Sequence, residues 1–194
     1  MNTIAAKASR FAVILTSLAM LNGCAVVATG AAAVGIKSIA DPRTIGSQID
    51  DQTIEMKANA KLGNDDKLKD FRLRTVSYDQ KVLLIGQVPD EQLRQRAKEV
   101  IDDTNGVVKI FNQIRLTSQA GLSVQAADSW ITSQVKLKLA ADDDVRASHI
   151  KVVTENGEVF LLGLVGSEQA DKAVEIARNV KGVERVIKAF SAPD

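Results

Sequence analysis

The sequence has little of the chemistry on which most enzymes depend. Its 194 residues include one cysteine and one histidine, which excludes an intramolecular disulfide and a His-rich metal site and leaves little for acid–base catalysis near neutral pH. No Ser/His/Asp set, P-loop or Gly-rich dinucleotide loop is recognisable. With 25 basic and 24 acidic residues the net charge is +1, so no global field attracts DNA or RNA. These absences favour a non-enzymatic protein with no cofactor, no metal and no nucleic-acid partner.

Two features that could suggest a metal site are better explained as ordinary surface. His149 has no second histidine and no nearby cysteine to complete a ligand set. Residues 142–144 are three consecutive aspartates, but they lack the glycine and the distant glutamate of a calcium-binding loop. We therefore expect a solvated loop at residues 142–144.

The N-terminus has the pattern of an export signal that ends at the single cysteine. Lys7 and Arg10 precede an apolar run at residues 11–21. This run is too short to span a bilayer, which takes about 20 residues. The sequence Leu-Asn-Gly-Cys at residues 21–24 resembles a bacterial lipobox, although Asn22 departs from it. Residues 1–23 are thus predicted to be a signal peptide, and Cys24 to carry acyl chains. The alternative is a buried cysteine beside a transmembrane helix.

The lipobox resemblance implies a Gram-negative lipoprotein on the periplasmic face of the outer membrane, because Ala25 rather than Asp follows the cysteine. Residues 24–50 are predicted to be the lipidated N-terminus and a linker. They are rich in Ala, Gly, Val and Ser, and Pro42 disfavours a helix through Asp41.

The remaining sequence consists of two repeats of one unit. The composition of the chain is that of a folded protein. Residues 51–62 align with residues 128–139, and residues 82–88 with residues 159–165, each 77 positions later. A Gly-Val pair at residues 106–107 recurs at residues 182–183. We predict two domains, residues 51–117 and residues 126–192, joined through residues 117–125.

Each copy predicts the same order of elements. An acidic residue, Asp51 or Asp128, is expected to cap a helix whose apolar residues recur every fourth position. Two strands joined by a tight turn follow, then a second helix and a last strand, at residues 107–116 and 183–190. The order α-β-β-α-β predicts an α+β fold with a small mixed three-stranded sheet covered by two helices.

At this point the chain resembles a known family. The strand motif Val-x-Leu-x-Gly-x-Val in each copy, the late Gly-Val pair and the element order resemble the BON domain, a module of the bacterial envelope. The resemblance implies a non-enzymatic periplasmic protein that binds anionic phospholipid, such as phosphatidylglycerol. It also implies a role in outer-membrane integrity and recruitment to division sites.

The first helix of the second copy is the candidate lipid-binding element. Trp130 and Leu137 are seven residues apart on one helical face, where the first copy has Thr53 and Ala60. The face also holds Ser133 and Gln134, with Lys136 and Lys138 beside it. Tryptophan favours the headgroup region of a bilayer, and lysines attract anionic lipid. In the family that this chain resembles, this helix engages lipid, and Trp130 matches its tryptophan.

Two alternatives remain open. Trp130 and Leu137 could instead pack against the linker or the first copy. The protein could also be an adaptor that binds an envelope-assembly or cell-wall remodelling factor. Gly86 and Gly163, each inside an apolar strand, are expected to serve the fold at a bulge or a close backbone approach.

Overall fold

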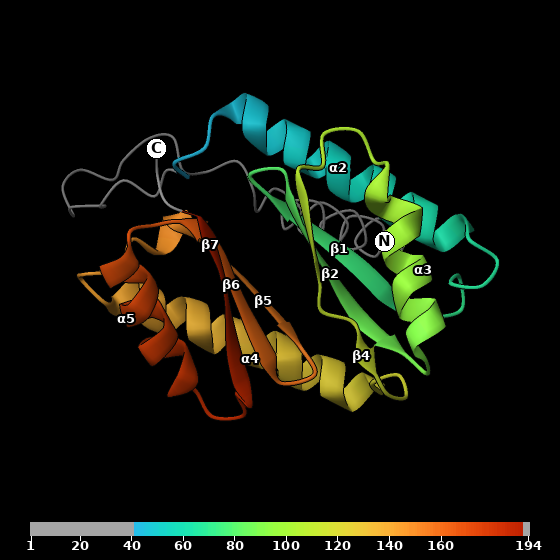
Figure 1. Ribbon diagram of the computed structural model, residues 1–194. Helices are drawn as coiled ribbons and strands as arrows, with labels where there is room; N and C mark the ends of the chain where they lie inside the picture. The colour runs from blue at the N-terminus through green and yellow to red at the C-terminus, as the bar shows by residue number, and fades with distance from the viewer. Residues whose placement is uncertain (1–40, 192–194) are drawn as a thin grey trace, which may run out of the picture. The chain divides into compact units, whose positions relative to one another are not determined.

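The computed structural model describes residues 41–191, which belong to one compact unit of residues 39–194 (Figure 1). The element order α-β-β-α-β occurs twice, as predicted. The first repeat consists of α2 (Ile45–Asn64), β1 (Leu73–Tyr78), β2 (Lys81–Val88), α3 (Glu91–Asp102), β3 (Lys109–Asn112) and β4 (Arg115–Leu116). The second consists of α4 (Leu122–Ala141), the short helix η1 (Ala147–His149), β5 (Ile150–Glu155), β6 (Glu158–Leu164), α5 (Ser167–Arg178) and β7 (Arg185–Ser191).

Each repeat forms the predicted small mixed sheet. β1 and β2 pair antiparallel, β2 and β3 pair parallel, and β4 continues the parallel pairing along β2. β5, β6 and β7 repeat this arrangement. Each hairpin turns through two residues with positive φ, Asp79 and Gln80 in the first repeat and Asn156 and Gly157 in the second. Such turns match the twist of the strands that they join.

Alternation along the strands divides the core into three parts. Val82 and Leu84 of β2 face α2 and α3 in one helix-covered core, and the second repeat has an equivalent core. Leu83 and Ile85 point the other way and pack against the second sheet. The third core is made by both sheets, with Val76, Tyr78, Leu83, Ile85, Val153, Phe160 and Leu162 buried in it. The two sheets therefore pack face to face, with a helix pair outside each (Figure 1).

The predicted caps were wrong. α2 begins at Ile45, six residues before Asp51, and its cap is Thr44, whose side chain accepts a hydrogen bond from the Ser47 N–H. Asp51 and Asp128 lie inside their helices and are buried. Their carboxylates accept hydrogen bonds from the backbone N–H groups of the β-hairpin turn in the same repeat. Long-range hydrogen bonds rather than the helix terminus explain these two acids.

The segments predicted as linker and joint are partly helical. Residues 45–50 of the predicted linker form the first turns of α2, and α4 begins at Leu122 inside the predicted joint at 117–125. The last strand of the first repeat was predicted to be continuous over residues 107–116. In the structure it is interrupted at residues 113–114. Ile114 leaves the ladder to enter the helix-covered core. In the second repeat, β7 is unbroken.

Candidate functional site

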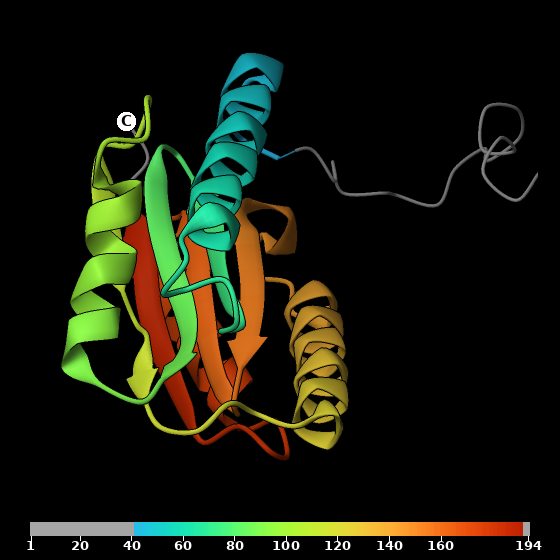
Figure 2. The same cartoon turned by 90° about the vertical axis from the view of Figure 1, so that its right-hand side faces the viewer.

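The outer face of α4 is an exposed apolar surface. Leu122, Trp130 and Leu137 are 83%, 49% and 64% exposed. They follow one another at helical spacing with Ala126 and Ser133, on the side opposite the buried residues Ile131, Val135 and Leu139. By helical spacing, Trp130 and Leu137 lie across α4 from that buried stripe, and α4 itself runs beside β5 (Figure 2).

The polar residues predicted for this site border the apolar face. Lys136 and Lys138 are exposed, and Lys138 Nζ donates a 3.3 Å hydrogen bond to the carbonyl oxygen of Asn179. Ser133 is exposed, but its hydroxyl donates to the carbonyl oxygen of Ser129 within the helix. Gln134 is half-buried. The face is therefore apolar along its centre and is flanked on opposite sides by the two lysines, Lys136 toward the groove that β1 and β5 line and Lys138 toward the end of α5 (Ser167–Arg178).

A second exposed apolar face, on α2, was missed from the sequence. Ile45, Ile49 and Met56 are exposed large apolar residues at the same helical spacing. Ile45 and Ile49 fall in the segment predicted as linker, as Leu122 falls in the predicted joint. The signal was present as the i, i+4 spacing of Ile45 and Ile49, and of Leu122 and Ala126.

The two helices that carry these faces differ in charge. α2 contains two lysines against three acids, Asp50, Asp51 and Glu55. α4 contains two lysines against one acid, the buried Asp128. Only α4 therefore has an excess of positive charge together with an aromatic residue.

The two strand glycines sit against the backbone at the start of the neighbouring edge strand, where Arg72 precedes β1 and His149 precedes β5. A Cβ atom on Gly86 would lie 2.4 Å from the Arg72 carbonyl oxygen, and one on Gly163 would lie 2.2 Å from the His149 carbonyl oxygen. Gly86 also has a φ of +134°, which L side chains rarely adopt. These contacts are too close for any side chain unless the edge strand moves.

Arg43 holds the start of the described chain against the first repeat. Its guanidinium donates to Asp51 Oδ2 at 2.5 Å and to Asp41 Oδ2 at 2.7 Å, and it lies 3.8 Å from the centroid of the Tyr78 ring. Burial opposes its charge, but hydrogen bonds to the two aspartates and the charge of Asp41 raise the pKa of Arg43. For the Tyr78 hydroxyl, which is charged only when it is deprotonated, burial raises the pKa to about 12.

The membrane anchor predicted at Cys24 lies outside the described residues, as do the signal peptide at 1–23 and most of the predicted linker. Between residues 41 and 191, no helix has both the length and the apolar character needed to cross a membrane.

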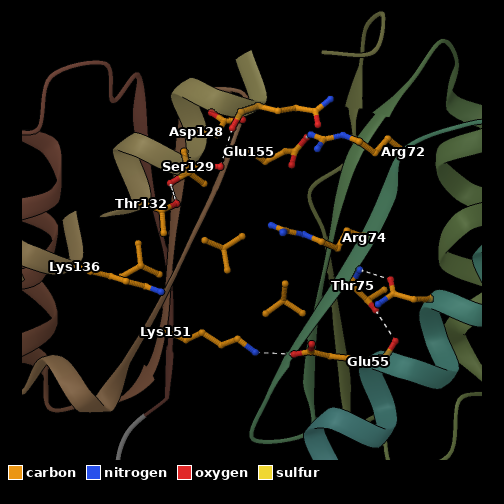
Figure 3. Close-up of a pocket in the computed structure, with 16 residues that line it drawn as sticks. Glu55, Arg72, Arg74, Thr75, Asp128, Ser129, Thr132, Lys136, Lys151 and Glu155 are labelled. Carbon is orange, nitrogen blue, oxygen red and sulfur yellow. Dashed lines mark hydrogen bonds and ion pairs between the residues drawn. The ribbon is translucent and has the colours of Figure 1, made fainter. Parts of the chain in front are cut away.

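A groove of about 570 Å³ lies between the two repeats. α2 and β1 form one wall, and α4 and β5 form the other (Figure 3). Two ion pairs cross it, Arg72 with Glu155 and Lys151 with Glu55, each at 2.6 Å. Arg74 and Lys136 point into the groove from opposite sides (Figure 3).

Comparison with known proteins identifies the class. The profile of the BON domain matches residues 50–118 and 127–193, which together make up more than half of the chain. The chain therefore belongs to the BON domain family and contains two copies of that domain.

Three relatives show how far the likeness extends. The outer membrane lipoprotein DolP of Haemophilus influenzae is 40% identical over 95% of this chain and 96% of its own length. The 21 kDa hemolysin of Actinobacillus pleuropneumoniae is 45% identical over 78% of each chain. The osmotically-inducible protein Y of Escherichia coli is 36% identical over 73% of this chain and 72% of its own. The chain is thus similar to a DolP-like protein with two BON domains.

Proposed function

We propose that this protein is a non-enzymatic lipoprotein of the outer membrane that binds anionic phospholipid through the outer face of α4. The relative of H. influenzae, similar along nearly its whole length, is named an outer membrane lipoprotein, which supports the localisation and the acylation of Cys24. On this proposal the folded unit lies on the periplasmic side and supports outer-membrane integrity, with recruitment to division sites as the BON resemblance implies.

The observation that carries the lipid-binding proposal is the exposure of Trp130 and Leu137 beside two lysines. A tryptophan at the level of the headgroups places its apolar ring in the bilayer and its N–H among polar groups. Lys136 and Lys138 contribute about 1 kcal/mol each near an anionic surface. A folded domain held at a bilayer by acyl chains needs only this modest affinity for α4 to rest on the surface.

Vesicle binding tests the proposal. Residues 25–194, made without acyl chains, are titrated with phosphatidylglycerol and with phosphatidylcholine vesicles and followed by co-sedimentation. We expect binding to the anionic vesicles alone, and a change in the fluorescence of Trp130, the single tryptophan.

Trp130→Ala is expected to weaken this binding about tenfold or more, because burial of a large apolar side chain is worth about 1.5–3 kcal/mol. The matched control is Met56→Ala, which removes an exposed apolar side chain from α2 instead. Equal binding by wild type and Trp130→Ala would contradict the proposal.

A second candidate function is supported by the apolar face of α2. Ile45, Ile49 and Met56 are exposed on a helix whose acids outnumber its lysines, which suits a protein partner better than an anionic membrane. On this alternative the protein is an adaptor for an envelope-assembly or cell-wall remodelling factor. Binding to neither vesicle, with loss of a protein partner in Met56→Ala, would favour it.

A further inference from the structure

The two repeats meet through pairs of equivalent contacts. Arg72 donates to Glu155 Oε1 at 2.6 Å across the interface. The residues 77 positions from these two are His149 and Tyr78. The Tyr78 hydroxyl donates to the His149 carbonyl oxygen at 3.3 Å, so the equivalent contact is present.

A second pair shows the same relation at the last strand of each repeat. Arg115 Nε donates to Glu158 Oε2 at 2.7 Å. Arg115 pairs with Gln87 as Ser191 pairs with Leu164, 77 positions after Gln87, so Ser191 is the equivalent of Arg115. Lys81 lies 77 positions before Glu158 and is its equivalent. Lys81 Nζ donates to Ser191 Oγ at 2.6 Å. The repeats are therefore related by an approximate two-fold axis, and each contact across the interface predicts a second one.

The third pair is incomplete, and it lies in the groove. Lys151 Nζ donates to Glu55 Oε1 at 2.6 Å. The equivalent residues are Arg74 and Thr132, so a neutral hydroxyl stands where the symmetry calls for a carboxylate. Within residues 41–191, the side chain of Arg74 has no acidic or hydrogen-bonding partner, although its backbone pairs with Ile85 in the sheet. Its guanidinium points into the groove without a counter-ion (Figure 3).

The same substitution changes the edge of the sheet. In the first repeat, α2 covers the outward N–H groups of β1: Thr75 N donates to Asn59 Oδ1 at 2.9 Å, and Ser77 N to Glu55 Oε1 at 2.8 Å. Two acceptors on the helix thus satisfy two donors on the edge strand.

In the second repeat those acceptors are missing. The equivalent N–H groups belong to Val152 and Thr154 of β5. Glu155 and Glu158 flank the two-residue turn and form a hydrogen-bonded pair. Because such pairs alternate along an antiparallel ladder, the N–H groups of Val152 and Thr154 point away from β6. Asn59 is replaced by Lys136 and Glu55 by Thr132. In the part of the chain that the structure describes, no acceptor is found for these two N–H groups.

Hydrogen-bond donors from both walls therefore line this groove. Besides Arg74, Lys136 and the two N–H groups, the Thr132 and Thr154 hydroxyls lie 2.7 Å apart, and one hydrogen of the pair remains free to donate outward. The acids of the lining already have partners: Glu55 accepts from Lys151, Glu155 from Arg72, and Asp128 from the hairpin turn.

We propose that this part of the groove binds a phosphate group, either of a soluble phosphate ester or of a lipid headgroup. Outward N–H groups at a sheet edge form an anion-binding concavity. An arginine fork and an ammonium group complement phosphate oxygens, and donors on both walls of the groove suit an anion that has oxygens on several sides. A groove of about 570 Å³ has room for the alcohol of an ester as well. Lys136, which flanks the outer face of α4, also lines this groove.

Titration with inorganic phosphate and with glycerol 3-phosphate tests the site, in residues 25–194 at constant ionic strength balanced with chloride. Amide chemical shifts of Val152 and Thr154, together with the melting temperature, report binding. We expect Arg74→Gln to weaken phosphate about tenfold or more, since a hydrogen bond to a charged group is worth about 1.5–3 kcal/mol. The matched control, Arg94→Gln on the far helix α3, removes the same charge and is expected to bind as wild type does.

Thr132→Glu gives the sharper test, because it supplies the carboxylate that the first repeat has. We expect it to raise the melting temperature without ligand, through an ion pair with Arg74, and to abolish the response to phosphate. An unchanged phosphate response in Thr132→Glu or Arg74→Gln, or no response in the wild type, would overturn the proposal.

Vesicles of phosphatidylglycerol separate the two sources of the phosphate. If Arg74→Gln also weakens vesicle binding, the site takes a lipid headgroup; if it weakens only the soluble ester, the site takes a free metabolite. Trp130→Ala separates this site from the proposed lipid face. It is expected to weaken vesicle binding while it still binds glycerol 3-phosphate as the wild type does.

Discussion

α2 and α4 bury equivalent residues and expose different ones. Ile54, Ala58 and Leu62 of α2 match Ile131, Val135 and Leu139 of α4, and all are buried. On the outer faces, Thr53 and Ala60 are replaced by Trp130 and Leu137. Toward the groove, Glu55 and Asn59 are replaced by Thr132 and Lys136.

The comparison teaches which residues serve the fold. Residues that both repeats share, such as the strand glycines and the buried helix aspartates, hold each repeat together. The helix residues that differ between the repeats do not serve the fold in this way. In the second repeat they lie on the outer face of α4 and in the groove between the repeats. Four groups of substitutions, from the largest expected effect to the smallest, test this division.

Alanine at either strand glycine is expected to have the largest effect. Gly163→Ala places a methyl group against the His149 carbonyl oxygen and should lower the free energy of unfolding by about 3 kcal/mol. Gly86→Ala should cost about 1 kcal/mol more, because its positive φ adds backbone strain. Urea unfolding followed by circular dichroism measures both. A loss smaller than about 0.5 kcal/mol at either position would show that the edge strand yields freely.

The buried helix aspartates come next. Asp51→Ala leaves Arg43, the Ser77 hydroxyl and two turn N–H groups short of an acceptor, so we expect a loss of about 3 kcal/mol in unfolding free energy. Asp128→Ala strands only the N–H groups of Asn156 and Gly157 and should cost about 2 kcal/mol. Thermal unfolding of the two variants side by side checks the order. The reverse order would mean that the ion pair between Arg43 and Asp51 contributes nothing to the free energy of unfolding.

Charge on α4 should affect membrane binding rather than stability. The double variant Lys136→Gln and Lys138→Gln is expected to weaken binding to phosphatidylglycerol vesicles about 30-fold, since each lysine contributes about 1 kcal/mol. The control is Lys57→Gln with Lys61→Gln, which removes the same charge from α2. Co-sedimentation at low and raised salt provides the measurement. Similar losses in both pairs would indicate attraction by the whole protein rather than by α4.

Tyr78 gives the smallest effect, and one that depends on pH. Burial raises its pKa from 10.0 to about 12. Its contribution to stability is therefore complete below about pH 10 and is lost as the pH rises through about 12. Tyr78→Phe should cost about 1 kcal/mol at neutral pH, from the hydrogen bond to His149, and should unfold with a weaker pH dependence in this range. Parallel pH dependences in wild type and variant would exclude Tyr78 as the titrating group.

The repeat made the fold predictable, because two copies of one pattern support each other's helices and strands. Helix starts were not predictable in the same way. An acid before an apolar periodic run is typical of a cap, and Asp51 and Asp128 fit that pattern while serving hairpins more than 20 residues away. The break at Ile114 likewise depends on a core that forms only in three dimensions.

The candidate sites divide in the same manner. Trp130 and Leu137 were visible from the sequence because they share one helix and the other copy lacks them. The groove was not, since Arg74, Lys136 and Val152 lie on three separate elements and nothing in their spacing brings them together. Once the two-fold relation is known, the missing carboxylate opposite Arg74 can be found by comparing the copies.

The contacts of Arg43 determine where a mechanical load enters the folded unit. A pull on the chain before Asp41 reaches Arg43 first, and its ion pair with Asp51 and its stacking on Tyr78 must give way before α2 can be peeled from the sheet. Tyr78 also contacts the second repeat through His149. We therefore expect tension on this part of the chain to be shared between both repeats through Tyr78.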